Sequence, residues 1–300
     1  MRNSVLLYET STTLERLRLK ICLGQHLHTM PLKTAAVSSP RFSLDFVECD
    51  PLPKAFRAMV RDGMLDVSEM ALATHLIARE FGKPLTALPA PVWRRLHHAN
   101  LVCLATSPIR GPKCLENKRV GVRAYSQTTG VWIRGILKTQ YAVDLDSVTW
   151  VTLEDAHVTE YRDPDNVVRD TSARSLRELL HAGEVAAIMG ERNADSDSVR
   201  PVIPDADCAA QDWADSLGVF PVNHVVAVRT ELLKHHPWLG TELMRLLDEA
   251  RVLSGASGLA SLPYGLEPNR ASMQMLCAFA ADQKLTRGER RIEDVLWAEG

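Results

Sequence analysis

Alternation of apolar and polar residues along the chain predicts strands separated by helices. Segments that alternate or stay apolar are expected as strands: 17–23, 42–49, 85–88, 100–106, 119–123, 147–153, 185–189, 202–204 and 225–228. Segments with helical spacing and capping residues are expected as helices: 54–62, 70–81, 128–141, 172–182, 230–234, 238–254, 270–283 and 290–297. A short turn carrying Ser68 and Glu69 is expected before the second of these helices.

The strand–helix rhythm occurs twice, which is typical of α/β proteins with parallel sheets. Turn-forming residues at 107–112 and 218–224 indicate two crossings between lobes. We therefore expect an α/β clamshell of two lobes, each a mixed or parallel sheet flanked by helices. The first lobe is expected to be discontinuous and to comprise residues 17–109 and 225–300. The second lobe, 110–224, is expected as an insertion between them, and residues 1–16 as an irregular N-terminal extension. Ligands bind at the carboxyl ends of strands in such sheets, which predicts a cleft between the lobes.

Composition narrows the class of partner. The chain has 300 residues, 46% of them apolar, and a formal charge of −2. That balance provides no electrostatic field for nucleic acid or an anionic membrane, so we expect a small-molecule partner. The composition leaves open whether the chain forms a homo-oligomer.

The cysteines and the N-terminus indicate a cytoplasmic protein. The six cysteines are scattered without a CxxC pair, so we expect buried free thiols in a reducing compartment. The first twenty residues contain one short apolar run, 5–7, and no secretory signal is predicted. No segment approaches the length of a membrane span.

A polar turn between Val122 and Val131 opens the helix expected over 128–141. Its backbone N–H groups have no helical partner and attract anions. Guanidinium, hydroxyl and amide side chains accompany them: Arg123, Ser126, Gln127, Thr128 and Thr129. The turn predicts binding of a carboxylate or phosphate, and ordinary helix capping by the same residues is the alternative.

Long motifs give the chain a family resemblance. The segments are SEMALATH, KRVGVRAYSQTTGVWIRGIL, VTWVTLEDAHV, GEVAAIMGER, GVFPVNHVVAVR and YGLEPNR. Together they resemble the 4,5-dihydroxyphthalate decarboxylases over roughly residues 17–297. That family is grouped with periplasmic binding proteins of the second structural type. The resemblance implies their clamshell fold and a carboxy-lyase of phthalate degradation and aromatic catabolism, which forms protocatechuate and carbon dioxide without oxidation.

Such a reaction needs a cationic clamp for carboxylates, an acid aimed at ring carbon and a base near a phenol. Arg123 is the expected clamp, and pairing with Glu154 or Asp155 at the surface is the alternative. His224 is the expected acid, and a structural histidine bridging backbone carbonyls is its alternative. Trp132 is expected to cover the substrate ring or, alternatively, to be core.

Other polar residues near the expected strand ends complete the candidate site. Glu154 and His157 are three residues apart and would share a face of a helical turn, so they are expected as an acid/base pair or a surface ion pair. The remaining candidates for substrate binding are His26, His28, Ser68, Glu69, Asn223 and Glu191. His26 and His28 alternate in an extended loop, so their side chains are expected to point the same way.

We expect no cofactor, and a divalent metal stays an alternative. Mixed histidine and glutamate ligands suit it, but no HxxxH or HExxH helix is present. Two other classes of function compete with the decarboxylase: a solute-binding protein for an aromatic carboxylate, serving a transporter or a sensor, and a synthase of the thiamin-precursor type. The synthase would need a Cys/His cluster, which the scattered cysteines do not offer.

Overall fold

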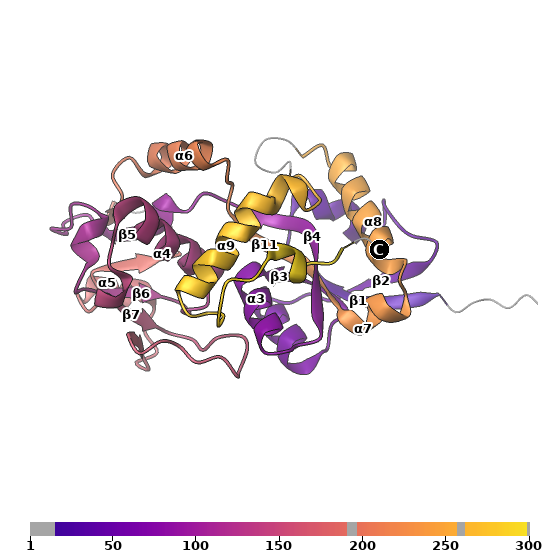
Figure 1. Cartoon of the computed structure of the whole chain (residues 1–300), viewed down its shortest axis with the longest axis horizontal. Coiled ribbons are helices and arrows are strands. Elements are labelled where there is room, and N and C mark those ends of the chain that lie inside the picture. The colour runs from indigo at the N-terminus through magenta and orange to yellow at the C-terminus, as the bar shows by residue number, and fades with distance from the viewer. Residues whose placement is uncertain (1–15, 191–196, 257–261, 299–300) are drawn as a thin grey trace, which may run out of the picture.

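The computed structural model describes residues 16–190, 197–256 and 262–298. Two sheets flanked by helices form two lobes that lie next to each other along the long axis of the molecule (Figure 1). The predicted N-terminal extension, except Arg16, and the candidate Glu191 lie outside the described residues.

The first sheet has five described strands in the order β2-β1-β3-β11-β4. Their bounds are β1 Leu17–Cys22, β2 Phe42–Phe46, β3 Val67–Ala71, β4 Leu85–Arg94 and β11 Val222–Arg229. Strand β1 is parallel to β2 and β3, whereas β11 is antiparallel to β3 and β4. Strand β3 is central and buried at every position, so both of its faces are fixed by packing.

The second sheet has six described strands in the order β10-β5-β9-β6-β7-β8. Their bounds are β5 Leu101–Leu104, β6 Arg119–Val122, β7 Thr149–Thr152, β8 Val167–Arg169, β9 Ala187–Met189 and β10 Val199–Pro201. Strand β6 is parallel to β7 and β9, and β5 is antiparallel to β9 and β10. Both sheets are therefore mixed.

Two strands belong to the sheets differently from what the expected lobe boundaries predict. Leu101–Leu104 was expected in the first lobe but pairs within the second sheet. Val222–Arg229 begins before the expected return at 225, so Asn223 and His224 belong to a strand of the first sheet. A fully apolar strand suits the middle of either sheet, and its composition does not specify its neighbours.

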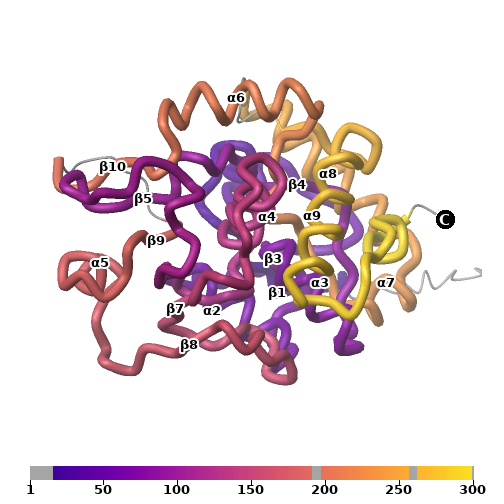
Figure 2. The backbone as a smooth tube through the Cα atoms, turned by 60° about the vertical axis from the view of Figure 1, so that its left-hand side comes forward, coloured from indigo at the N-terminus to yellow at the C-terminus, as the bar shows by residue number. Residues whose placement is uncertain are grey.

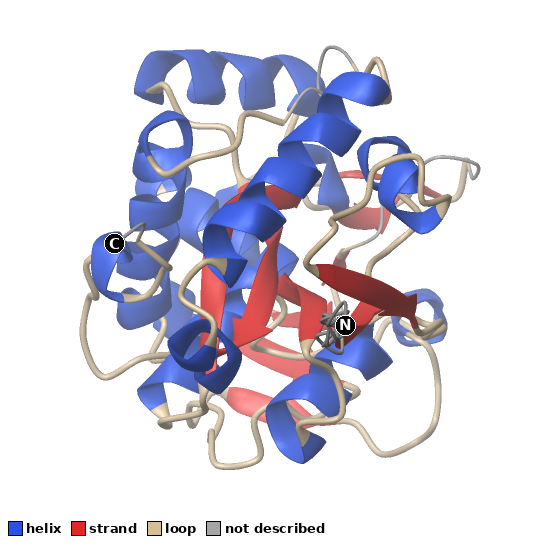
Figure 3. Cartoon of the chain, turned by 90° about the vertical axis from the view of Figure 1, so that its right-hand side faces the viewer, coloured by secondary structure: helices blue, strands red, loops and turns tan. Residues whose placement is uncertain are grey.

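Helices surround the strands (Figure 3). Their bounds are α1 Met30–Lys33, α2 Pro53–Arg57, α3 Leu72–Glu80, α4 Thr128–Tyr141, α5 Leu176–His181, α6 Ala206–Leu217, α7 Thr230–His235, α8 Leu239–Leu253 and α9 Arg270–Asp282. Helix α4 has the predicted bounds. A five-residue π-helical turn, Ala58–Asp62, extends α2, and Gly63 ends it with φ 61°.

Several local predictions were wrong. Ser68 and Glu69 lie on β3 rather than in a turn, because the strand runs directly into α3. The helix expected to begin at 172 begins at Leu176, where Ser175 caps α5 and forms a capping box with Glu178. The helix expected over 290–297 contains only a short 3-10 turn, Ile292–Asp294. Helix α6 and strand β8 had no predicted counterpart.

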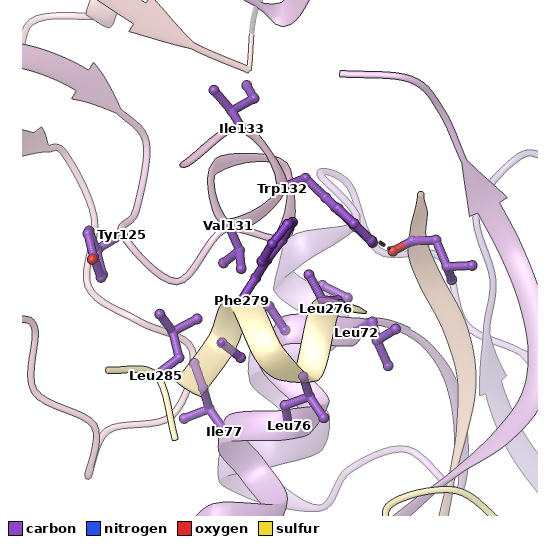
Figure 4. Close-up of a cluster of buried hydrophobic side chains, with 14 of the residues drawn as sticks. Leu72, Leu76, Ile77, Tyr125, Val131, Trp132, Ile133, Leu276, Phe279 and Leu285 are labelled. Carbon is purple, nitrogen blue, oxygen red and sulfur yellow. Dashed lines mark hydrogen bonds between the residues drawn. The ribbon is translucent and has the colours of Figure 1, made fainter. Parts of the chain in front are cut away.

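Helix α9 joins the lobes by packing on α3 of the first and α4 of the second (Figures 1 and 2). At its end, Gln283 Oε1 accepts from Arg134 Nε (2.7 Å), and its Nε2 donates to the Val131 carbonyl (2.9 Å). The rings of Trp132 and Phe279 meet edge to face at 5.7 Å (Figure 4). This contact makes α9 part of the hydrophobic core that the two lobes share.

Gly135→Ala is expected to lower the free energy of unfolding by about 1–3 kcal/mol, because overpacked cores must shift side chains or backbone. A β-carbon at position 135 would overlap the Phe279 ring. Denaturant unfolding measures the effect, and the double variant Gly135→Ala/Phe279→Leu should lose less than the two single losses combined. Gly111→Ala is the matched control, since its extended backbone (φ 171°) and open surroundings accept a methyl group. If the double variant lost as much stability as the two single variants combined, overlap between the added methyl group and the Phe279 ring would not be the cause.

His75 on α3 should make the fold sensitive to acid. Burial lowers the pKa of His75 to about 4 from the ordinary 6.5, although its Nε2 bonds the Val295 carbonyl at 2.8 Å. The folded state therefore disfavours protonation of His75. The stability contributed by the neutral ring is complete above pH 6.5 and is lost as the pH falls toward 4. At pH 5 the loss is roughly 2 kcal/mol. Urea unfolding at pH 7.5 and 5 should show less pH dependence in His75→Gln than in wild type, and equal dependence would refute the assignment. His181→Gln, on the exposed end of α5, is the control.

The thiols and helices test two further expectations. All six cysteines are free, and Cys22, Cys103 and Cys277 are buried as expected. Cys114 and Cys208 are exposed, which corrects their assignment to the core. Among the described residues, every helix is too short or too polar to cross a membrane.

Candidate active site

A cavity of about 460 Å³ lies between the two sheets and receives side chains from both lobes. Its walls come mainly from segments that follow the carboxyl ends of β1, β2, β3, β6, β7 and β9, where α/β sheets bind ligands. Its volume suits a small organic molecule. The lining residues are Gly24, Gln25, His26, Leu52, Pro53, Phe56, Glu69, Ala71, Thr74, Trp93, Arg95, Arg123, Gln127, Thr128, Thr129, His157, Gly190, Asn223 and His224.

Glu69 is the buried centre of one wall. His224 Nδ1 lies 2.6 Å from its Oε1, and His26 Nε2 lies 2.8 Å from its Oε2. The Gly24 N–H also donates to Oε2 (2.8 Å). Burial raises the pKa of Glu69, but the hydrogen bonds from His224 and His26 outweigh it and hold that pKa well below its ordinary value. Glu69 is therefore an anion that accepts from both rings.

Strand register explains why Glu69 and His224 meet. Val226 on β11 pairs with Glu69 on β3, and His224 pairs with Ala71. Because side chains two residues apart share a face of a strand, His224 is the diagonal neighbour of Glu69. The pairing of two distant segments thus assembles a carboxylate–imidazole pair.

Aromatic rings fix the orientation of His224. Phe56 and Trp93 meet its ring edge to face, with centroids at 5.2 and 4.7 Å. Since Nδ1 is bound to Glu69, Nε2 is the nitrogen left for a ligand. The arrangement matches an acid/base histidine oriented by a carboxylate.

The second lobe contributes a cationic region to the cavity, on the side opposite Glu69. Arg123 follows β6 and lines the cavity, with its Nη1 3.8 Å from Glu154 Oε2. Arg57 also pairs with Glu154. Glu154 itself does not line the cavity and has a 36% exposed side chain, so the structure places it as an ion-pair partner of both arginines.

His157 lines the cavity beside these cations. Its Nδ1 lies 2.9 Å from Thr74 Oγ1. Burial, followed by the charges of Arg57, Arg123 and Arg61, lowers the pKa of His157 to about 3. It is therefore neutral at ordinary pH, and it does not pair with Glu154 as expected from their spacing.

Two helices begin at the cavity. Helix α3 starts after Ala71 and α4 starts after Gln127, and neither of these N-cap residues makes a side-chain capping bond. Thr128 Oγ1 accepts from the Ala73 N–H (3.2 Å), which ties the two helix starts together. Their partial positive charge adds to that of Arg123, so an anion is favoured here.

A hydrogen-bonded network supports this region. Arg95 Nη2 donates to Thr129 Oγ1 (3.0 Å), and Asn223 Nδ2 donates to the same oxygen (3.3 Å). His97 Nε2 lies 3.0 Å from Asn223 Oδ1. Burial lowers the pKa of His97 well below its ordinary value, so the neutral ring donates to the amide oxygen. Arg95 thereby belongs to the cavity wall.

The structure brings together most of the predicted site residues. The predicted residues that line the cavity are His26, Glu69, Arg123, Gln127, Thr128, Thr129, His157, Asn223 and His224. The residues that sequence analysis missed include Phe56, Thr74, Trp93 and Arg95. Trp93 and Arg95 follow two prolines, and the proline-rich segment was not expected to continue β4 to Arg94.

Several predicted residues lie elsewhere. Trp132 is completely buried, donates from Nε1 to the Val222 carbonyl (3.0 Å) and is core. A 3-10 turn at Leu27–Thr29 places His28 in the interior, with its ring stacked on His26, so the two do not line the cavity together. Ser68 lies on the opposite face of β3 from Glu69, and Ser126 is buried before α4.

Metal ligation has no ready geometry in the parts of the chain that the structure describes. No group of three His, Cys, Asp or Glu side chains there is arranged to hold a metal ion. The arrangement that is present can bind an anionic ring beside cations and transfer a proton from an imidazole.

Sequence comparisons agree with the family resemblance. No family model matches the chain. It is 28% identical over 254 residues to 4,5-dihydroxyphthalate decarboxylase of Comamonas testosteroni, across 80% of this chain and 77% of that protein. It is 26% identical over 217 residues to the enzyme of the same name from Pseudomonas putida, across 68% and 84%.

Solved structures agree with the architecture. The periplasmic aliphatic sulphonate binding protein SsuA from Escherichia coli matches with a TM-score of 0.61 and 13% identity, covering 94% of this chain and 97% of that one. Desulfurization enzyme DSZB matches with a TM-score of 0.55 and 13% identity, covering 95% and 97%. At such identities the likeness concerns the fold. The chain thus has the fold of periplasmic binding proteins and, in sequence, resembles the 4,5-dihydroxyphthalate decarboxylases over most of its length.

Proposed function

We propose that the protein is a carboxy-lyase that removes one carboxylate from 4,5-dihydroxyphthalate, or a close hydroxylated aromatic dicarboxylate, without oxidation. One observation carries the proposal: a single cavity holds a carboxylate-oriented histidine, His224, and a cationic region around Arg123. The names of the two relatives add the substrate class.

The chemistry explains why an acid is needed. Direct loss of carbon dioxide would leave an aryl anion whose electron pair the ring cannot delocalise. Protonation of the carbon that bears the carboxylate avoids this anion, with a para hydroxyl group losing its proton to give a dienone. The bond to the carboxylate then breaks, carbon dioxide leaves, and its electron pair restores the aromatic ring.

His224 is the proposed acid. Its Nδ1 is bound by Glu69 and its side chain is only 13% exposed, so the ring has a fixed direction and Nε2 is left to carry the proton. A carboxylate bound behind the ring is the arrangement that orients histidines for proton transfer. Phe56 and Trp93, besides holding His224, give the cavity apolar surface for an aromatic ring.

Arg123 is the proposed carboxylate clamp. A guanidinium binds a carboxylate through two parallel hydrogen bonds, and the starts of α3 and α4 supply further N–H donors. Thr128 and Thr129 line the same wall. Arg95 lines this wall as well, with its Nη2 donating to Thr129 Oγ1, and it is the proposed partner of the second carboxylate.

Turnover of 4,5-dihydroxyphthalate tests the proposal. Purified protein should release carbon dioxide and convert the ultraviolet spectrum to that of protocatechuate. The competing function is that of a solute-binding protein, which would bind the compound without consuming it. A ligand-dependent rise in Tm with no carbon dioxide would refute the carboxy-lyase and favour the binding protein.

We also propose that the reaction uses no dissociable cofactor. Both oxygens of Glu69 already accept hydrogen bonds from histidines, which supports a proton-transfer role for the cluster. Dialysis against a chelator should leave kcat unchanged. Loss of activity that a divalent cation restores would overturn this part of the proposal.

A further inference from the structure

Two histidines share one carboxylate, and the proposed function uses only one of them. His26 binds Glu69 through Nε2 and His224 binds it through Nδ1, so each ring keeps its other nitrogen. Both rings line the cavity, with side chains 20% and 13% exposed. The first ring follows β1 and the second lies on β11, so the pair is assembled only by the fold.

Glu69 is suited to holding these rings rather than to accepting a proton itself. It is completely buried and accepts a third hydrogen bond, from Gly24. A buried carboxylate whose oxygens are all engaged in hydrogen bonds fixes the direction of each ring that donates to it. Glu69 is a positioning residue for both.

Other histidines near the cavity lack this arrangement. His157 uses Nδ1 on Thr74 and is surrounded by arginines. His28 is buried behind His26. Of the described histidines that line the cavity, His26 is therefore the one that shares a carboxylate with the acid His224.

We propose that His26 is the base that removes the proton from the ring hydroxyl para to the departing carboxylate. This inference rests on the proposed function and defines its substrate class more narrowly: an aromatic carboxylate with a hydroxyl group para to the carboxylate that leaves. Each carboxylate of 4,5-dihydroxyphthalate has such a hydroxyl.

The proton balance closes over one turnover. His26 takes the phenolic proton while protonated His224 gives one to the carbon that bears the carboxylate, which forms the dienone. The carbon–carboxylate bond breaks, carbon dioxide leaves, and the electron pair returns to the ring as the dienone oxygen becomes a phenolate. Protonated His26 returns its proton to that phenolate. Solvent reprotonates His224, so each turnover consumes one proton.

The pH dependence of a His26→Asn variant tests the role. At pH 7 we expect kcat to fall about 100-fold with little change in KM, as for loss of a general base. Wild-type kcat should have a bell-shaped pH profile, because His26 acts as a base when neutral and His224 acts as an acid when protonated. His26→Asn should lose the decline of kcat toward acidic pH and keep the decline toward alkaline pH. His224→Asn should do the reverse.

Matched variants keep the test decisive. His26→Gln, whose longer amide can reach Glu69, should also lack the decline of kcat toward acidic pH, and Glu69→Gln should lower kcat and change the pH profile because it loosens both rings. His181→Asn, at the exposed end of α5, is the control and should match wild type. Each variant's Tm and its ligand-dependent rise in Tm establish folding and binding.

The outcomes separate the two proposals. A wild-type protein that converts 4,5-dihydroxyphthalate while His26→Asn retains its kcat and pH profile would overturn the role of His26 alone. A loss of kcat that leaves the decline toward acidic pH in place would also overturn it. A wild-type protein that binds the compound but releases no carbon dioxide would overturn the proposed function and, with it, this assignment.

Discussion

Replacing His224 with asparagine should lower kcat by about 10²–10⁴-fold and change KM little. The asparagine amide can still donate to Glu69, so the cavity keeps its shape. It cannot carry a proton to ring carbon, which is the step that avoids the aryl anion. Initial rates with 4,5-dihydroxyphthalate measure the effect.

His235→Asn is a suitable control for this substitution, because His235 lies at the exposed end of α7 outside the cavity. It should leave both kcat and KM unchanged. Normal turnover by His224→Asn would eliminate His224 as the acid, whatever the activity of the wild-type protein.

Replacing Arg123 with alanine should raise KM by about 10–100-fold, because a charged hydrogen bond to a carboxylate contributes about 1.5–3 kcal/mol. The Arg123 side chain is 31% exposed and lines the cavity, so it is accessible to a ligand. Arg123→Lys should recover part of the loss, since it restores the charge but not the two-pronged geometry.

Arg57→Ala separates binding from the ion pair. Arg57 pairs with the same Glu154 but does not line the cavity. If Arg123 binds the substrate, Arg57→Ala should raise KM much less than Arg123→Ala. Equal effects would indicate that both arginines act through Glu154, and the clamp would be wrongly assigned.

Sequence periodicity predicted the parts of the site that depend on regular elements. The bounds of α4 and the polar turn before it could be predicted because capping residues and an amphipathic pattern coincide there. Arg123 and His224 could be chosen because each adjoins an apolar strand, and both line the cavity. Their chemical roles stay proposals.

Features that depend on pairing between distant segments could not be predicted. Glu69 was expected in a short turn as a substrate-binding residue, yet β11 beside β3 makes it the partner of His224. Trp93 follows two prolines, a residue type that usually ends a strand. Strand β4 nevertheless continues through both prolines and brings Trp93 to His224. His28 turns inward because its loop forms a 3-10 turn rather than an extended chain. Local sequence does not encode such register.

Product formed in D2O tests the central claim most directly. If the cavity protonates ring carbon, NMR of wild-type reactions should show protocatechuate with one deuterium at the carbon that lost its carboxylate, together with carbon dioxide. Unchanged 4,5-dihydroxyphthalate, in the presence of a ligand-dependent rise in Tm, would contradict the account.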